Sequence, residues 1–306
     1  MQNFEDLLRQ AVSPDALSLQ EPLNRHTTFR IGGPADYFAA PATMQEAAAV
    51  VRLCREQSYP FYVIGNGSNL LVSDAGYRGL ILQLYRNFSA VTVEGEEITA
   101  QSGAMLSVIA KRALAAGLTG FEFASGIPGT IGGAAVMNAG AYGGEMKDVL
   151  TSVTVLTQEN DVRTIPAGEL CLGYRYSVIP ENGWIVLGAT LRLQKGDPDA
   201  IRARMEELKE KRVSKQPLDL PSAGSTFKRP EGYFAGKLIM DAGLRGFAVG
   251  GAQVSGKHCG FVVNRGNATA ADVLALIREV QARVRAAFGV ELEPEVKMLG
   301  EMKDTM

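Results

Sequence analysis

The sequence contains few histidines and few cysteines. Its 306 residues include two histidines, His26 and His258, and three cysteines, Cys54, Cys171 and Cys259. With only two histidines, we expect neither a histidine-rich metal site nor a zinc site of two cysteines and two histidines, and we predict no bound metal. Three cysteines far apart in the chain are a poor disulfide framework and are typical of reduced thiols in the cytoplasm.

Long apolar runs and an excess of one charge are also missing. No run approaches the roughly 18–20 apolar residues that span a bilayer. The first ten residues carry acidic side chains where a secretory signal would carry lysines. The net charge is −2, and no basic stripe indicates a nucleic-acid partner. We therefore expect a cytoplasmic protein with no membrane insertion and no nucleic-acid partner, long enough for two or three domains.

The pattern of apolar residues predicts many short strands and a few helices. We expect strands at 61–64, 80–84, 91–93, 98–100, 153–156, 162–165, 184–193 and 260–263, and helices at 3–12, 43–57, 106–116, 198–211 and 269–289. Thr43 with Glu46, and Thr269 with Asp272, have the spacing of capping boxes. A stripe of Val273, Ile277, Val280 and Val284 is expected to face the core.

Two glycine-rich segments are the most informative feature. Residues 125–144 contain seven glycines and no charge, and residues 65–70 read Gly-Asn-Gly-Ser-Asn-Leu after the apolar run 61–64. Glycine at this density lets backbone N–H groups approach a ligand, but it also suits a tightly packed junction. Two such loops in one chain favour a large nucleotide held in an extended form.

The shorter loop is not a dinucleotide-binding fingerprint of the Rossmann type. Leu70 occupies the position of the third glycine, and no helix is expected to follow it. No acidic residue lies about 20 positions further on to hold a ribose. The backbone N–H groups of this loop, with the side chains of Asn66, Ser68 and Asn69, can still form a nest for an anion.

Seven segments in order resemble the UDP-N-acetylenolpyruvoylglucosamine reductase family, also called UDP-N-acetylmuramate dehydrogenase. They are HTTFRIGGPAD from residue 26, IGNGSNLL from 64, GIPGTIGG from 126, YRYS from 174, QPL from 216, PSAGSTF from 221 and LEPEV from 292. Together they span nearly the whole chain, which is far more specific than any one motif. The short segment between Tyr176 and Trp184 lacks a tyrosine-bearing loop and is similar to the shorter, second-type branch.

The resemblance implies an α+β fold and non-covalently bound FAD. It implies an FAD-binding fold of the vanillyl-alcohol oxidase type, with two subdomains, followed by a smaller α/β C-terminal substrate domain. The composition changes after residue 196, and prolines follow at 217 and 221. We accordingly predict an N-terminal helix at 1–20, the FAD-binding domain at 21–196, a connecting helix at 197–213 and the C-terminal domain at 214–300.

The resemblance also implies which residues bind the cofactor. The FAD diphosphate is expected on Asn66, Gly67, Ser68, Asn69 and Leu70. The flavin is expected against Gly126, Ile127, Pro128, Gly129, Gly132, Gly133, Asn138, Ala139 and Gly140, with Arg245 reaching it from the C-terminal domain.

The family's reaction assigns further roles. In this family NADPH reduces the flavin and leaves, and the enolpyruvyl ether of UDP-N-acetylglucosamine takes its place and becomes UDP-N-acetylmuramate, a peptidoglycan precursor. Hydride reaches C3 from the reduced flavin, so negative charge develops at C2 and on the carboxylate, which requires fixed donors and a positioned acid. The resemblance maps these roles onto Arg175, Ser225 and Glu295, with Ser225 as the proton donor.

Substrate-binding residues and two alternatives complete the expectation. Lys215, Arg229 and His258 stand where the family binds its sugar nucleotide.

One alternative is another FAD-dependent oxidase or dehydrogenase of the same fold, although neither histidine lies in an obvious covalent attachment loop. The other is a non-catalytic nucleotide-binding protein, which would explain the glycine loops but not the three matching catalytic positions.

Overall fold

The structure is a computed structural model that describes residues 3–302, and these form two compact units. The first unit comprises the residues up to Ser18, Tyr37–Asn66 and Gly79–Arg212. The second comprises Leu19–Asp36, Gly67–Arg78 and the residues from Val213 onward. Both units are therefore discontinuous in sequence. The functional domains expected from the sequence remain a prediction. The predicted boundary between residues 213 and 214 falls next to Val213, where the last segment of the second unit begins.

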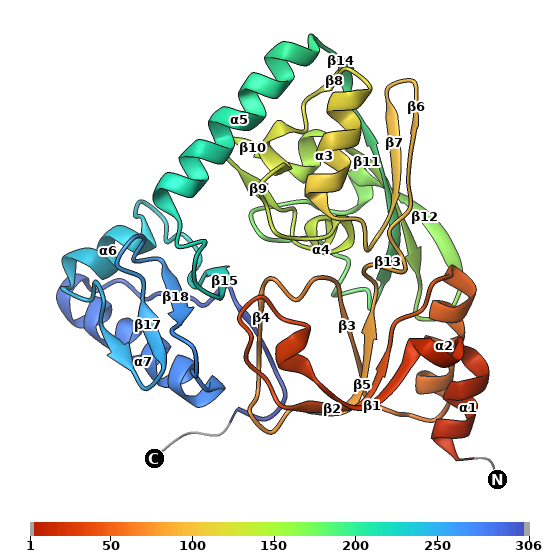
Figure 1. The fold of residues 1–306 in the computed structure, drawn as a ribbon, viewed down its shortest axis with the longest axis horizontal. Helices are drawn as coiled ribbons and strands as arrows, with labels where there is room; N and C mark the ends of the chain where they lie inside the picture. The colour runs from red at the N-terminus through yellow and green to blue at the C-terminus, as the bar shows by residue number, and fades with distance from the viewer. Residues whose placement is uncertain (1–2, 303–306) are drawn as a thin grey trace. The chain divides into compact units, whose positions relative to one another are not determined.

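The first unit is built on a five-stranded antiparallel sheet (Figure 1). Its strand order is β12-β11-β13-β7-β6. The strands are β6 (Val91–Glu94), β7 (Glu97–Gln101), β11 (Leu150–Leu156), β12 (Val162–Pro166) and β13 (Ile185–Arg192). Helices α3 (Leu106–Ala115) and α4 (Ile131–Val136) pack on this sheet. The core between them includes the fully buried Ile98, Leu106, Ile131, Val153 and Leu191.

A second core of the first unit lies beneath helices α1 (Phe4–Ala11) and α2 (Met44–Glu56). Leu8, Val50 and Cys54 from these helices are buried with Leu80 and Leu82. The adjoining four-stranded sheet has the order β1-β2-β5-β3. Its strands are β1 (Leu17–Pro22), β2 (Pro34–Ala39), β3 (Phe61–Ile64) and β5 (Tyr77–Gln83), and β1, β2 and β5 contain residues of both units.

The second unit has an antiparallel sheet of order β15-β18-β17-β16, with helices α6 (Ala235–Asp241) and α7 (Ala270–Phe288). The strands are β15 (Ser222–Ser225), β16 (Ala248–Val249), β17 (Ala252–Val254) and β18 (Phe261–Asn264). A separate parallel pair joins β4 (Leu70–Val72) to β19 (Lys297–Leu299). The predicted stripe on α7 is confirmed, because Val273, Ile277, Val280 and Val284 are at most 1% exposed.

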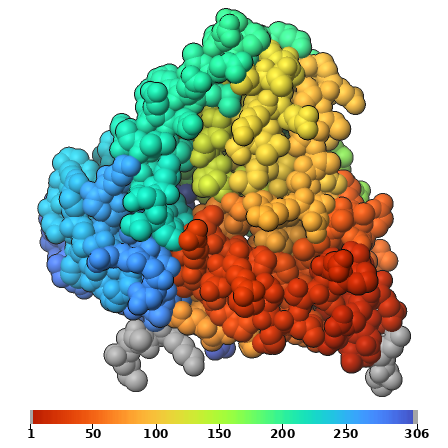
Figure 2. Space-filling model, in the orientation of Figure 1, coloured from red at the N-terminus to blue at the C-terminus, as the bar shows by residue number. Residues whose placement is uncertain are grey.

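The remaining elements are short, apart from α5 (Pro198–Lys215). Strands β8 (Leu118–Thr119) and β14 (Gln194–Lys195) pair with each other, as do β9 (Gly140–Ala141) and β10 (Gly144–Glu145). Helix α5 is exposed along most of its length, as the green residues of the space-filling view show (Figure 2).

The structure confirms most of the predicted elements. Both predicted capping boxes are present, at Thr43 and at Thr269. The sequence pattern does not predict α4, because glycine disfavours helix and two glycines lie in its first turn. Burial of Ile131, Ala134 and Ala135 against the five-stranded sheet overrides that local preference.

Candidate active site

The two glycine-rich loops meet within the first unit. The side chain of Asn66 donates from Nδ2 to the carbonyl oxygen of Pro128, at 2.9 Å. The first residue of the shorter loop is also held by strand β5, since Gln83 Nε2 donates to Gly65 O at 3.2 Å. A hydrogen bond therefore joins two segments that are about sixty residues apart in sequence.

The first turn of α4 presents a bare backbone face. Gly133 is exposed, and a Cβ atom added there would meet only Thr130 Oγ1, at 3.8 Å. On the inner side, Gly132 N donates to Ser102 O at 2.9 Å. Ser102 is 3% exposed, and its Oγ atom makes no hydrogen bond within residues 3–302. A buried hydroxyl without a partner costs about 1–3 kcal/mol, so a polar ligand or an ordered water is expected beside it.

Arg212 borders the same loop, and the sequence analysis did not select it. Its buried Nε atom lies 2.8 Å from the position that a Cβ of Gly126 would take, so a side chain at residue 126 would displace it. Its guanidinium carbon lies 5.8 Å from the ring centre of Tyr142. Burial lowers the pKa of Arg212, and Tyr142 opposes that shift. Arg212 lies within the charged, mostly exposed helix α5, so no local pattern marks it as half-buried.

The end of the shorter loop belongs to the second unit and is anchored there. Thr28 N donates to Gly67 O at 3.2 Å. Asn69 Nδ2 donates to Glu295 O at 3.3 Å, and Asn69 O accepts from Lys297 N at 3.0 Å. The predicted diphosphate loop and the predicted catalytic Glu295 are thus held side by side.

Ser225 lies next to the same C-terminal segment. It is the last residue of β15 and is exposed. The following residue, Thr226, accepts at its carbonyl oxygen from Glu295 N, at 2.8 Å, and an isolated bridge pairs Phe227 with Pro294. The structure therefore brings two of the three predicted catalytic residues, Ser225 and Glu295, onto adjacent backbone segments.

His258 is linked to this arrangement through Gly260, and the charge of Lys215 acts on His258. His258 Nδ1 accepts from Gly260 N at 3.1 Å, and Gly260 O in turn accepts from Thr226 N at 2.8 Å. Burial is the main cause that lowers the pKa of His258, and the positive charge of Lys215 lowers it further. The half-buried imidazole is therefore predominantly neutral at pH 7, while the exposed Lys215 supplies positive charge close by.

Arg229 and Arg245 are exposed and bind to their own surroundings in the second unit. Arg229 Nε donates to Tyr233 O at 3.3 Å, and its guanidinium lies 4.0 Å from the ring centre of Phe234. Arg245 donates to Gly256 O and also contacts Met240 Sδ. Their roles toward substrate and flavin remain predictions.

Arg175 lies in the first unit on a tight turn. Tyr176 N donates to Gly173 O at 3.2 Å and closes the turn. Arg175 has φ +53°, in the left-handed region that costs a residue with a side chain about 1–2 kcal/mol. A strained backbone of this kind is found preferentially at functional sites. The guanidinium lies 5.3 Å from the ring centre of Tyr174, and Nη2 contacts Gly140 O at 3.4 Å.

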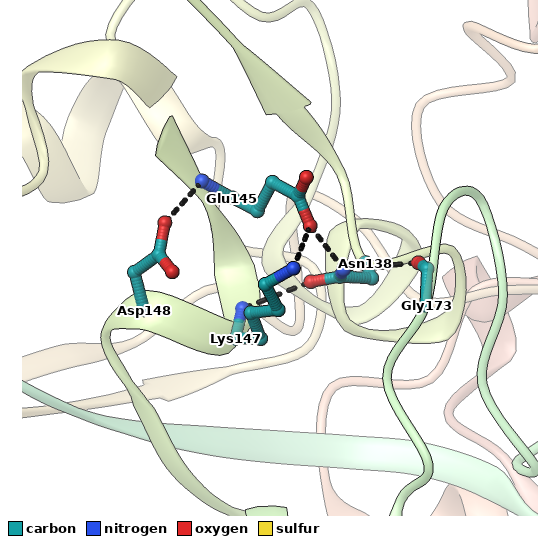
Figure 3. A network of polar contacts seen from close by, with 5 residues as sticks. All are labelled: Asn138, Glu145, Lys147, Asp148 and Gly173. Carbon is teal, nitrogen blue, oxygen red and sulfur yellow. Dashed lines mark hydrogen bonds and ion pairs between the residues drawn. The ribbon is translucent and has the colours of Figure 1, made fainter. Parts of the chain in front are cut away.

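The predicted flavin-lining segment 138–140 is partly committed to this turn. Asn138 is 1% exposed, and its side chain bonds to Glu145, Gly173 and the Lys147 N–H (Figure 3). The side chain of Asn138 is thus already bonded within the protein.

Residues 3–302 contain neither a metal-ligand cluster nor a membrane-spanning helix. No group of three or more histidine, cysteine, aspartate or glutamate residues there could hold a metal ion. In the same part of the chain, no helix is both long and apolar enough to cross a bilayer.

Comparison with known proteins assigns the chain to a class. Residues 35–165 match the model of an FAD-binding domain, so the chain is an FAD-dependent oxidoreductase of α+β fold. The solved structure of p-cresol methylhydroxylase, at 16% identity and a TM-score of 0.50, shares this fold over 64% of the chain and 43% of its own length. The predicted FAD-binding fold of the vanillyl-alcohol oxidase type is confirmed.

The family follows from closer relatives. Residues 216–299 match the C-terminal domain of UDP-N-acetylenolpyruvoylglucosamine reductase. The reductase of that name from Agathobacter rectalis is 54% identical, over 98% of this chain and 99% of its own. The crystal structure of the Thermus caldophilus enzyme is 36% identical with a TM-score of 0.80, covering 93% of this chain and 98% of that one. The chain belongs to the UDP-N-acetylenolpyruvoylglucosamine reductase family.

Proposed function

We propose that this protein reduces the enolpyruvyl ether of UDP-N-acetylglucosamine to UDP-N-acetylmuramate with NADPH, in the cytoplasm, during peptidoglycan precursor synthesis. The observation that carries the proposal is the 54% identity, over 98% of the chain, to a reductase named for this substrate. The adjacent placement of Ser225 and Glu295 supports it, because the reaction requires a positioned acid.

The residues of both glycine loops fit FAD. Residues 66–70 would hold its diphosphate, and residues 126–133 with the backbone of 138–140 would line its ring system. The bond from Asn66 to Pro128 O joins these loops, and the partnerless Ser102 Oγ beside α4 offers a donor to a polar ligand. FAD, when bound, supplies a ring that accepts hydride from NADPH and passes it to the substrate.

The chain's own residues would manage charge and protons. The guanidinium of Arg175 carries a permanent charge and two parallel donors, which suit the substrate carboxylate as negative charge develops on it. The Ser225 hydroxyl would give its proton to C2, and Glu295 would act beside it on the bonded neighbouring segment.

Binding of the sugar nucleotide would use the cationic residues of the second unit. Lys215, whose charge is felt at His258, would neutralise part of the diphosphate. We assign Arg229 and His258 to the sugar nucleotide, and Arg245 to the flavin. The short segment after Tyr176 offers no tyrosine-bearing loop for the diphosphate, so these cations would carry that contact.

The test follows flavin absorbance without oxygen. NADPH should bleach the flavin bands of the FAD-loaded protein, and the enolpyruvyl sugar nucleotide should restore them. Ser225→Ala should bleach at the wild-type rate but recover about 10²–10⁴-fold more slowly, as loss of a general acid predicts. Ser222→Ala, on the same strand, is the matched control and should behave as wild type.

Each outcome separates the candidates. A wild-type flavin that bleaches but is not restored by this substrate would indicate another FAD-dependent oxidoreductase of the same fold. Equal recovery in Ser225→Ala would reject Ser225 as the proton donor. Equal bleaching rates with NADH would reject the preference for NADPH.

A further inference from the structure

We propose that Asn138 and Ser177 are positioning residues for Arg175, and that they hold the turn at 173–176 in the strained form that aims the guanidinium. The proposal rests on the proposed function, in which Arg175 meets the substrate carboxylate. It concerns two buried polar side chains that the reaction itself does not use.

The turn needs an external constraint. Gly173 N and Tyr176 N each donate to the carbonyl oxygen of the other residue, at 3.0 and 3.2 Å, so Tyr174 and Arg175 are its two central residues. The second central residue has positive φ, a position that glycine or asparagine usually occupies. Arginine gains nothing locally from φ +53°, so packing from outside the turn must impose it.

Asn138 binds the carbonyl that closes the turn. Its Nδ2 donates at 3.0 Å to Gly173 O, the same atom that accepts the Tyr176 N–H. Asn138 is itself left-handed, with φ +43°, a conformation that asparagine tolerates better than most residues. Because Gly173 O accepts from both Asn138 Nδ2 and Tyr176 N, the first residue of the turn is held in place.

A charged network holds Asn138 in turn (Figure 3). Asn138 Nδ2 also donates to Glu145 Oε2 at 2.7 Å, and its Oδ1 accepts from Lys147 N at 2.8 Å. Glu145 N donates to Asp148 Oδ2 at 2.8 Å. The hydrogen bond from Lys147 is the main cause that lowers the pKa of Glu145, and the bond from Asn138 adds to it. An ionised acceptor strengthens the bond that orients the amide.

Ser177 fastens the other end of the turn. It is 2% exposed and lies two residues after Arg175, and its hydroxyl donates to Val136 O, two residues before Asn138. The direct contact from Arg175 Nη2 to Gly140 O is long, at 3.4 Å. The backbone of the turn is therefore fixed at both ends, and the Arg175 guanidinium contacts Gly140 O and the Tyr174 ring.

The consequence is specific to one half of the reaction. Loss of either anchor lets residue 175 relax toward negative φ, which moves the guanidinium from its position. A misplacement of about 1 Å can cost on the order of 10²-fold in rate. Only the step that uses Arg175, oxidation of the reduced flavin by the enolpyruvyl substrate, should slow.

The experiment measures both half-reactions of the FAD-loaded enzyme by stopped flow. The variants are Ser177→Ala, which removes only a hydroxyl, and Asn138→Gly, which accepts φ +43° without strain. We expect Ser177→Ala to leave flavin reduction by NADPH within twofold of wild type, and we expect both variants to slow reoxidation by substrate about 10–100-fold. The control Asn160→Gly, at another left-handed asparagine in the hairpin between β11 and β12, should change neither rate.

A second arm tests whether the anchors act through Arg175. Combining either variant with Arg175→Lys should slow reoxidation no further than Arg175→Lys alone, because one function is already lost. Additive losses, equal slowing of both half-reactions in Ser177→Ala, or unchanged reoxidation would each overturn the proposal. If the wild-type flavin is not reoxidised by this substrate, the proposed function itself fails, and the positioning role falls with it.

Discussion

Asp74 should be a major determinant of the stability of α7, because it caps that helix from a distant loop. Four N–H groups at a helix start lack partners within the helix. Here Thr269 N donates to Asp272 Oδ2, and Asp272 N to Thr269 Oγ1, both at 3.0 Å. Ala270 N and Ala271 N donate to the two carboxylate oxygens of Asp74, at 2.8 and 3.1 Å. Asp74 therefore satisfies two of the four groups.

The magnitude follows from these contacts. Removing a capping side chain costs about 0.5–2 kcal/mol, and a negative charge at a helix N-terminus contributes about 0.3–1 kcal/mol more. Ala270 is 2% exposed, so water cannot easily replace its lost acceptor. We expect Asp74→Ala to lower the free energy of unfolding by about 2 kcal/mol. Asp74→Asn keeps one acceptor oxygen and should lose about 1 kcal/mol.

Urea unfolding followed by circular dichroism gives the global change, and hydrogen exchange gives the local one. A loss of about 2 kcal/mol corresponds to roughly 30-fold faster exchange in the first turn of α7. The control is Asp199→Ala, an exposed acid in the first turn of α5, which should change stability by less than about 0.5 kcal/mol. An Asp74→Ala protein as stable as wild type, or more stable than Asp74→Asn, would refute the reasoning.

Two further predictions concern titratable side chains. Burial raises the pKa of Cys54 to about 12 and also raises that of Cys259, whereas Cys171 is exposed. A disulfide reagent should therefore find one fast thiol in the native protein, lost in Cys171→Ser, and a second fast thiol would contradict this. Burial lowers the pKa of His258 below its ordinary value of about 6.5, so the unfolded chain binds more protons in that window. The free energy of unfolding should then fall as pH drops through about 6.5 and below. In urea titrations, His258→Gln should flatten this dependence on pH. An unchanged dependence of the unfolding free energy on pH would exclude His258 as its source.

Much of the secondary structure could be predicted because its causes are local. The capping boxes at Thr43 and Thr269 need only two side chains three residues apart. The hairpin between β6 and β7 turns at Gly95, whose φ is +63°. Helix α4 could not be predicted in this way, because its stability comes from burial against strands far away in the sequence.

The candidate site likewise has features that the sequence shows and features that only the structure shows. Glycine loops are visible in the sequence, and the order of seven motifs indicates the family, which the comparisons confirm. Arg175, Ser225 and Glu295 have no spacing that would select them without that resemblance. The pairing of the Thr226 and Glu295 segments appears only in the structure, since about seventy residues separate them.

The sequence by itself determined the features that act over a few residues: the capping boxes, the apolar period of α7, the turns at glycine and the ordered motifs of the family. Only the tertiary structure decided which distant groups meet. Asp74 caps a helix 196 residues further along, and Asn138 holds Gly173 across 35 residues. Each such contact consists of one or two hydrogen bonds of modest net energy, so it leaves no periodic pattern in the chain. Its geometry exists only after the cores on either side have packed. The strained backbone of Arg175 likewise exists only in the packed structure.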